Sequence, residues 1–199
     1  MIDFNTVTRF EQEVAEFFGA PQAVAVDCCT HGIELLLRLY QVTQTDCPRR
    51  TYLSVPMTLM KLGIDFVWND QAWQDHYQFA NTPIIDAASL WRQGAYIPGT
   101  AMVLSFQYQK PLKLGRGGMI LLDREDQAEK LRSMSYDGRL RGQGWQTQQI
   151  TTLGYHYYMT PETAALGLKK LEIMRSVRAQ SLGARDYPDL STLPVFVNV

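Results

Sequence analysis

The chain has 199 residues, of which 46% are hydrophobic and 20% are charged, a balance typical of one globular domain. Its formal net charge of −1 indicates no basic surface for nucleic acid, and no uninterrupted apolar run approaches the length of a membrane span. The opening residues, Met-Ile-Asp-Phe-Asn, lack the basic and apolar regions of a signal peptide. We therefore expect a cytoplasmic protein with no nucleic-acid or membrane partner.

Helical and strand-like segments alternate from the N-terminus. Apolar residues at helical spacing predict a first helix over residues 6–18, which Gly19 ends. A short buried strand is expected at 23–26, followed by an amphipathic helix that runs to about Tyr40. The later expected elements are a strand at 51–54, a helix from Pro56 to Leu62, strands at 64–68, 83–86, 101–104 and 118–122, and helices at 125–133 and 161–178.

This alternation predicts an α/β fold with a mainly parallel sheet and helices on both faces. In such folds ligands bind outside the carboxyl ends of the strands. Four expected strands end there on polar residues, namely Asp27, Ser54, Asp86 and Ser105. Residues 139–149 lack periodicity and read as a mobile loop. We divide the chain into one domain, 1–182, and an extended C-terminal tail, 183–199, that contains two prolines.

The cysteines give no sign of a metal site or a disulfide framework. Cys28, Cys29 and Cys47 are odd in number and lack metal-ligand spacing, although His31 follows the adjacent pair. Neighbouring cysteines also make a poor disulfide. We expect reduced structural thiols and no bound metal.

Lys110 and Asp86 are the strongest candidates for chemistry. Each lies at or just after the end of an apolar strand, and a glycine-rich turn follows Lys110. An amine and a carboxylate placed in this way suit pyridoxal phosphate (PLP), because the amine forms a Schiff base with its aldehyde and the carboxylate keeps the pyridine nitrogen protonated. The alternative is that Asp86 caps a helix starting at Ala87 and Lys110 is a solvated loop residue.

Several segments resemble, in the same order and spacing, the DegT/StrS-type sugar aminotransferases, a PLP-dependent family with the aspartate-aminotransferase fold (PLP fold type I). Two of the most informative are Ile-Asp-Ala-Ala-Ser at 85–89 and Ser-Phe-Gln-Tyr-Gln-Lys at 105–110. The others lie at 10–19, 27–32, 51–54, 114–119, 154–160 and 164–168. The resemblance runs nearly end to end, but it covers only the PLP-binding large domain of that family.

The resemblance implies a role for each matching residue. Lys110 would be the Schiff-base lysine and then a proton-transferring base, and Asp86 would pair with the pyridinium nitrogen. Tyr52 would stack on the cofactor ring, unless it is an ordinary core tyrosine. Thr30 and Ser105 would bind the phosphate. Thr30 can also act as a helix N-cap, and a serine at the end of a strand often bonds only to nearby backbone.

Four positions depart from the family pattern. Cys29 replaces a glycine of the phosphate cradle, which implies some adjustment there. Ser89 replaces a glutamine expected near the ring oxygen and is too short to reach equally far. His156 replaces an asparagine that reaches the phosphate from the neighbouring subunit, and its alternative is an interface or surface histidine. Tyr158 replaces an arginine, so one expected cation is absent.

The implied function is amine transfer from an amino acid to a keto-sugar nucleotide, in a homodimer with shared active sites. A lysine rather than a histidine at position 110 argues against the dehydratase branch of the family. The family's small C-terminal domain has no counterpart in this chain. The alternative is therefore a catalytically weak or inert homodimer of the same fold that serves in binding or assembly.

Overall fold

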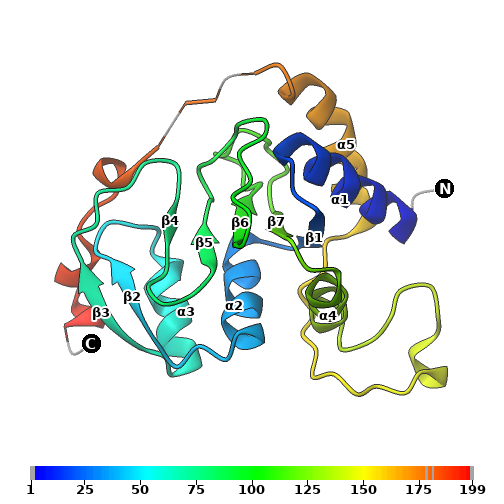
Figure 1. Ribbon diagram of the computed structural model, residues 1–199, viewed down its shortest axis with the longest axis horizontal. Helices are drawn as coiled ribbons and strands as arrows, with labels where there is room; N and C mark the ends of the chain where they lie inside the picture. The colour runs from blue at the N-terminus through cyan, green and yellow to red at the C-terminus, as the bar shows by residue number, and fades with distance from the viewer. Residues whose placement is uncertain (1–2, 178, 181, 198–199) are drawn as a thin grey trace.

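The computed structural model describes residues 3–177, 179–180 and 182–197. Its centre is a five-stranded sheet in the order β1-β7-β6-β5-β4, with a separate pair formed by β2 and β3 (Figure 1). The strands are β1 (Gln22–Val26), β2 (Gln44–Pro48), β3 (Asp65–Asn69), β4 (Tyr77–Gln78), β5 (Ile84–Asp86), β6 (Ala101–Ser105) and β7 (Gly118–Leu122). The helices are α1 (Phe4–Phe18), α2 (Cys29–Leu39), α3 (Ser54–Leu62), α4 (Glu125–Ser135) and α5 (Pro161–Met174).

The strand directions differ from the expected mainly parallel sheet. Only β5 and β6 run parallel in the central sheet, whereas β1–β7, β6–β7 and β4–β5 are antiparallel, so the sheet is mixed. The reason is the connection between β6 and β7, where residues 106–117 form turns without a helix. A parallel pair needs a crossover, usually a helix, and these turns instead bring β7 back beside β6. The α/β class itself is confirmed.

Alternation along the strands builds two cores, one on each face of the sheet. In β6, Met102 and Leu104 face the core that contains the apolar side of α1, while Ala101 and Val103 face the core that contains α2. Helices α1 and α5 pack together on the first face. The sheet therefore holds α2 against the second face, where the start of this helix meets the strand ends that carry the polar side chains.

Two glycines set how closely α2 approaches the sheet. A Cβ on Gly32 would lie 2.6 Å from Val103, and a Cβ on Gly118 would lie 2.7 Å from backbone atoms of both Cys28 and Cys29. Because a backbone contact cannot give way as a flexible side chain can, Gly118 is the stricter requirement. The first turn of α2 consequently rests on the beginning of β7.

The expected strand at 51–54 is wrong, and two strands were not expected at all. The chain instead forms β2 at Gln44–Pro48 and then a turn, and α3 begins at Ser54. The sequence Gln-Thr-Asp-Cys-Pro of β2 shows no apolar alternation from which a strand could be predicted. Its parallel pairing with β3 is what makes this segment a strand. The two-residue strand β4 is likewise defined by its pairing with β5.

The expected extended tail is also wrong. Residues 183–197 form three short 3-10 helices, at Ala184–Asp186, Leu190–Thr192 and Pro194–Phe196. These turns bury Leu190 and Phe196, and the Phe196 ring lies 5.5 Å from that of Trp68 on β3. Burial of two large apolar side chains offsets part of the cost of ordering the segment. The domain boundary at 182 stays a prediction, and Arg178, where the last helix was expected to end, lies outside the described residues.

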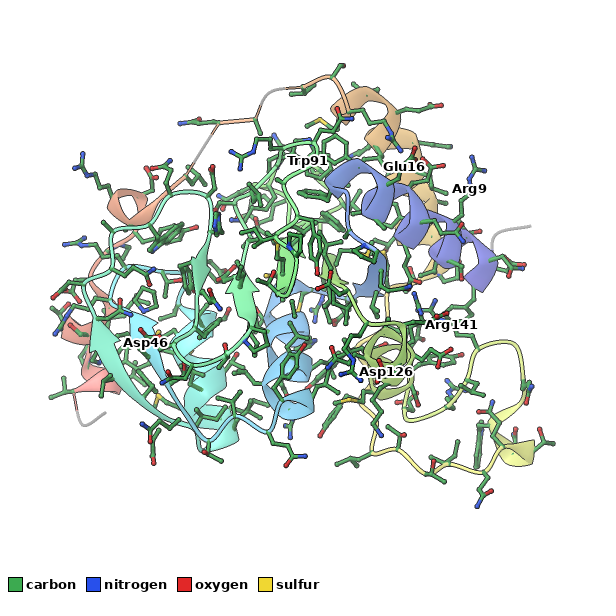
Figure 2. All side chains as sticks on the ribbon, viewed as in Figure 1. Arg9, Glu16, Asp46, Trp91, Asp126 and Arg141 are labelled. Atoms are coloured by element: carbon green, nitrogen blue, oxygen red, sulfur yellow. The ribbon has the colours of Figure 1, made fainter. Side chains whose placement is uncertain are left out.

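The glycine- and glutamine-rich segment after α4 projects from the body of the molecule (Figure 1) and contains only the short 3-10 helix Trp145–Thr147. It is tethered at its start by Arg141, which lies near α1 and α4 (Figure 2) and pairs with the buried Glu11 at 3.3 Å. Within the described part of the chain, no helix combines the length and apolar character that a membrane crossing requires.

Candidate active site

One cavity of about 850 Å³ gathers most of the predicted site residues. It lies where the parallel strands β5 and β6 end and where α2 begins, because the carboxyl ends of parallel strands meet at one edge of a sheet. The predicted residues that line it are Cys29, Thr30, Tyr52, Asp86, Ser105 and Lys110. Ser89 lines an adjoining cavity, and His156 lines neither of these two cavities.

Asp86 is the last residue of β5, and its carboxylate is buried. It accepts a hydrogen bond of 2.7 Å from the Tyr77 hydroxyl and one of 3.0 Å from the backbone N–H of Ala88. Residues 87–90 form a turn, so Asp86 does not cap a helix at Ala87. Its carboxylate is held in place by these two donors at the floor of the cavity.

The electrostatics of Asp86 leave room for a cation. Burial raises its pKa, while the hydrogen bonds from Tyr77 and Ala88 and the charge of Lys110 work in the opposite direction. No ion pair among the described residues includes this carboxylate. A buried carboxylate held by neutral donors gains most from a positive group that enters the cavity.

Tyr77 was missed by the sequence reasoning. It lies on β4 directly opposite Asp86 in the register of the β4–β5 pair. Its hydroxyl is buried and also shares a 2.7 Å hydrogen bond with the Thr51 hydroxyl. The chain Thr51–Tyr77–Asp86 thus supports the carboxylate from behind. A strand of two residues carries no periodic signal by which this contact could have been found.

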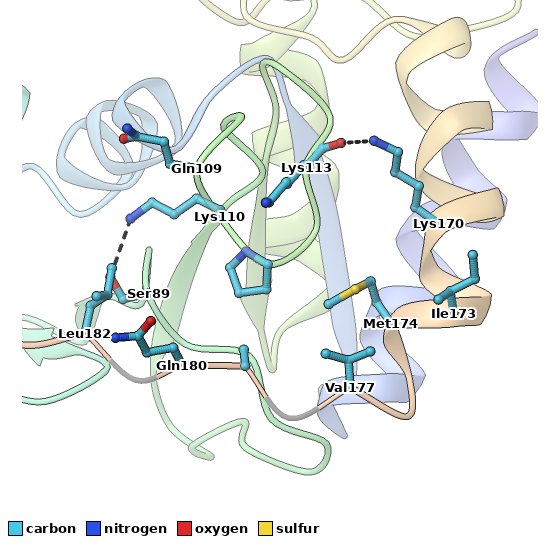
Figure 3. A pocket seen from close by; sticks show the side chains of 12 residues that line it. Ser89, Gln109, Lys110, Lys113, Lys170, Ile173, Met174, Val177, Gln180 and Leu182 are labelled. Atoms are coloured by element: carbon cyan, nitrogen blue, oxygen red, sulfur yellow. Dashed lines mark hydrogen bonds between the residues drawn. The ribbon is translucent and has the colours of Figure 1, made fainter.

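Lys110 lies on the turn after β6, half-buried between the two cavities. Its amine points toward Ser89, and Nζ lies 3.5 Å from the serine Oγ (Figure 3). The adjoining cavity, of about 620 Å³, also contains Lys113 and Lys170, and the Lys170 amine donates to the Lys113 carbonyl. The Lys110 amine is therefore positioned at the junction of both spaces, and its role as the Schiff-base lysine stays a prediction.

At the start of α2 the main cavity offers backbone N–H and hydroxyl groups that suit an anion. The first N–H groups of α2 have no intrahelical partner, and the helix dipole makes this end positive. Hydroxyl groups gather beside it, with Thr30 Oγ1 and Ser54 Oγ 2.7 Å apart. Ser105 lines the same cavity from the end of β6. Helix N–H groups together with hydroxyls form a typical phosphate site.

Two cations line the cavity near this end, and the sequence reasoning assigned a role to neither. Arg116 and His31 both contact Asp27 at 2.7 Å. Burial lowers the pKa of His31, but the hydrogen bonds and charges of Asp27 and Cys28 together outweigh it and raise the pKa to about 9. Cys28 is close enough for ligand atoms of Asp27, Cys28 and His31 to lie within 4.8 Å of one another. A protonated, ion-paired histidine fits this cluster better than a metal ligand does.

Cys29 does not intrude on the anion site. Its sulfur points into the protein, 4.0 Å from Asp86 Oδ1 and 3.8 Å from the Val103 carbonyl oxygen. Burial raises the pKa of this thiol well above its ordinary value, so it stays protonated. A cysteine at this position was expected to require an adjustment of the phosphate cradle. Here its side chain points toward Asp86 and Val103 inside the protein. All three cysteines are free thiols.

Tyr52 and His156 occupy very different positions. Tyr52 lies on the cavity rim with 55% of its surface exposed, so it is not an ordinary core tyrosine, and its stacking role stays a prediction. His156 is exposed and pairs with Asp137 at 3.1 Å. It does not reach the cavity of its own chain, and its expected action on a neighbouring subunit stays a prediction.

Comparison with known proteins places this fold among the PLP fold type I proteins related to aspartate aminotransferase. The family model of the DegT/DnrJ/EryC1/StrS aminotransferase family matches residues 1–78 and 92–185. The chain therefore belongs to this family.

Three similar proteins illustrate the relationship. The chain is 26% identical to the spore coat polysaccharide biosynthesis protein SpsC of Bacillus subtilis, across 89% of this chain and 60% of that protein. It superposes on AtS13 from Actinomadura melliaura with a TM-score of 0.75 and 21% identity, and on the sugar aminotransferase CalS13 from Micromonospora echinospora with a TM-score of 0.70 and 20% identity. Each superposition covers 85% of this chain and 60% of the other. The chain thus spans about 60% of the length of these relatives.

Proposed function

We propose that this protein is a PLP-dependent aminotransferase. The observation that carries the proposal is the convergence of Lys110, the buried Asp86 and the first turn of α2 on one cavity. The residues fit the cofactor at both of its ends. Asp86 lacks a cationic partner within the described protein and can pair with a protonated pyridine nitrogen, while the N–H groups of α2 and the nearby hydroxyls suit a phosphate.

Each side chain of the cavity is assigned a separate role in the proposed reaction. When bound, PLP supplies an aldehyde and an electron-accepting ring. Asp86 would hold positive charge at the ring nitrogen, Lys110 would bind the cofactor and move a proton at the substrate carbon, and Tyr52 would offer its exposed ring for stacking. Thr30, with Ser54 beside it, and Ser105 from the end of β6 would donate hydrogen bonds to the phosphate. Arg116 and protonated His31 add positive charge along the same wall.

For substrates we propose an amino-acid donor and a keto-sugar nucleotide acceptor. Membership of the family supports the sugar, and CalS13 is itself described as a sugar aminotransferase. The working unit would be a homodimer in the cytoplasm. A second candidate is a catalytically weak or inert homodimer that serves in binding or assembly, which the departures from the family pattern at Cys29, Ser89 and Tyr158 support.

Replacing Lys110 by alanine tests the proposal most directly. The wild-type protein mixed with PLP should become coloured, and borohydride should then join the cofactor to the peptide that contains Lys110. Lys110→Ala should lose this adduct because no other amine lies beside Asp86 in the described cavity. Lys113→Ala is the matched control, since Lys113 lines only the adjoining cavity and should keep the adduct. The readout is mass spectrometry of the digested protein.

A second measurement separates the two candidates. Glutamate added to the coloured protein should shift its absorbance, and a keto-sugar nucleotide should restore it. Wild-type protein that stays colourless with PLP would contradict the proposal. Protein that binds PLP through Lys110 but never shifts with an amino donor would favour the inert homodimer.

A further inference from the structure

The outer wall of the main cavity is formed by a segment that lies beyond the family match. That match ends at residue 185. The later residues that line the cavity are Asp186, Tyr187, Pro188, Leu190 and Leu193, which we call the tail wall. The chain leaves α5 on one side of the molecule, and its last described residues lie beside β3 on the other side (Figure 1). The tail wall is therefore a feature of this chain that the family pattern does not describe.

The tail wall is anchored firmly to the turn between β2 and α3. The backbone N–H of Leu190 donates to the Arg49 carbonyl at 2.8 Å, and the Arg49 guanidinium donates to Ser191 Oγ at 2.7 Å. Arg50 donates to the Tyr187 carbonyl at 3.0 Å. These bonds involve Arg49 and Arg50, which lie three and two positions before Tyr52. The tail wall is thus fixed next to the rim residue that is proposed to stack on the cofactor.

A second anchor acts from behind the cavity. Phe196 is 1% exposed and packs edge-on against Trp68, and it does not line the cavity. Leu190 is also buried, at 3% exposed. Burying two such side chains stabilises the docked segment.

The chemistry of the wall is mainly apolar. Pro188, Leu190, Leu193 and the ring of Tyr187 contribute carbon surface, and its single carboxylate, Asp186, already accepts a 2.7 Å hydrogen bond from the Gly183 N–H. Leu53 and Val55 supply further apolar surface to the same cavity. An apolar lining of this kind offers no further site for an anion. It limits which ligands fit by their size and shape.

We propose that the tail wall is a specificity-determining element that sets the size of the ligand this cavity accepts, with Leu193 as its adjustable residue. Leu193 lines the cavity and is half-buried, so its side chain can be changed with little loss of packing. Trimming it should admit larger ligands, and enlarging it should exclude them. The consequence for substrate choice rests on the proposed function, but the control of access does not.

The test uses Cys28, a partly exposed thiol in the same cavity, as a reporter in the cofactor-free protein. The rates of its alkylation by small N-ethylmaleimide and by bulky N-pyrenylmaleimide are compared by mass spectrometry of the Cys28 peptide. Leu193→Ala should raise the bulky-to-small rate ratio several-fold, and Leu193→Trp should lower it several-fold. Val195→Ala is the matched control on the exposed side of the tail and should leave the ratio unchanged.

Two further results decide the proposal. Phe196→Ala removes the anchor without touching the cavity and should raise the same ratio, provided that circular dichroism shows a folded protein. If the ratio is equal in wild type and in both Leu193 variants, the tail wall does not control access and the proposal is overturned. Because no PLP is present, this outcome is distinct from a failure of the wild-type protein to bind PLP, which would overturn the proposed function instead.

Discussion

At the scale of single residues, the unusual group is the buried carboxylate of Asp86, which forms no ion pair with any of the residues that the structure describes. Taking an unpaired carboxylate out of water is costly, and the protein reduces this cost with the hydroxyl of Tyr77 and the N–H of Ala88. Both donors favour the ionised form. Asp86 is thereby kept ready for a cation, which is the property that a ring-nitrogen partner needs.

Removing the Tyr77 hydroxyl should raise the pKa of Asp86 further. In the wild type, burial already raises the pKa of Asp86 above its ordinary value of 3.8. At a pH between the pKa of the unfolded state and that of the folded state, the folded state therefore binds more protons. Over this range the free energy of unfolding falls as the pH rises. Tyr77→Phe should extend that fall to higher pH. The measurement is a carbon-13 NMR titration of the aspartate carboxyl groups in cofactor-free protein, with the Asp86 signal assigned from Asp86→Asn.

Tyr96→Phe is the matched control for this prediction. Tyr96 is also a largely buried tyrosine, but its hydroxyl donates to the Thr100 carbonyl, at 2.9 Å. Tyr96→Phe should leave the midpoint of the Asp86 carboxyl titration the same as in the wild type. An unchanged midpoint in Tyr77→Phe would mean that Tyr77 does not hold the carboxylate in its ionised form.

At the scale of elements, Glu11 ties α1 to the rest of the molecule. Its side chain is 2% exposed, accepts a 3.0 Å hydrogen bond from the Ala25 N–H of β1, and pairs with Arg132 of α4 at 3.1 Å and with Arg141 of the projecting segment at 3.3 Å. One carboxylate thus joins a helix, a strand, a second helix and a loop. The arrangement fixes where the projecting segment leaves the body of the protein.

Glu11→Ala should destabilise the protein by about 3 kcal/mol, the lower end of the range for breaking a buried ion pair, because Arg132 can be partly rehydrated. Glu13→Ala on the same helix is the control. Its pair with Arg175 is about one-third exposed on both sides and should cost about 0–1 kcal/mol. Urea unfolding curves of both variants give the comparison. Equal losses in the two would show that the Glu11 cluster adds no special stability.

At the scale of the whole molecule, the projecting segment bears on the proposed dimer. It carries large apolar side chains that are exposed in the single chain: Leu140, Trp145, Ile150 and Leu153. His156 follows closely and points into no described cavity of its own chain. An exposed apolar group of this kind favours contact with another molecule. In a two-fold dimer each chain would both give and receive this segment.

Mixing two inactive variants tests whether sites are shared. If His156 serves the site of the partner, Lys110→Ala and His156→Ala chains should each be weak alone but regain activity when combined, because one of the two sites in a mixed dimer carries neither lesion. The readout is amine transfer, with sedimentation used to confirm dimers. A monomer at micromolar concentration that still binds PLP tightly would contradict the shared site.

Local pattern by itself determined the alternation of helices and strands and the residues at the strand ends, since apolar spacing and polar strand ends are properties of short stretches. Lys110, Asp86 and Ser105 became candidates in this way, whereas Thr30 became a candidate through the family resemblance. Only the tertiary structure decided the strand directions, the Tyr77 contact and the tail wall. These depend on pairings between distant segments, such as the two-residue β4 against β5, and a segment that short carries no periodic signal for its partner.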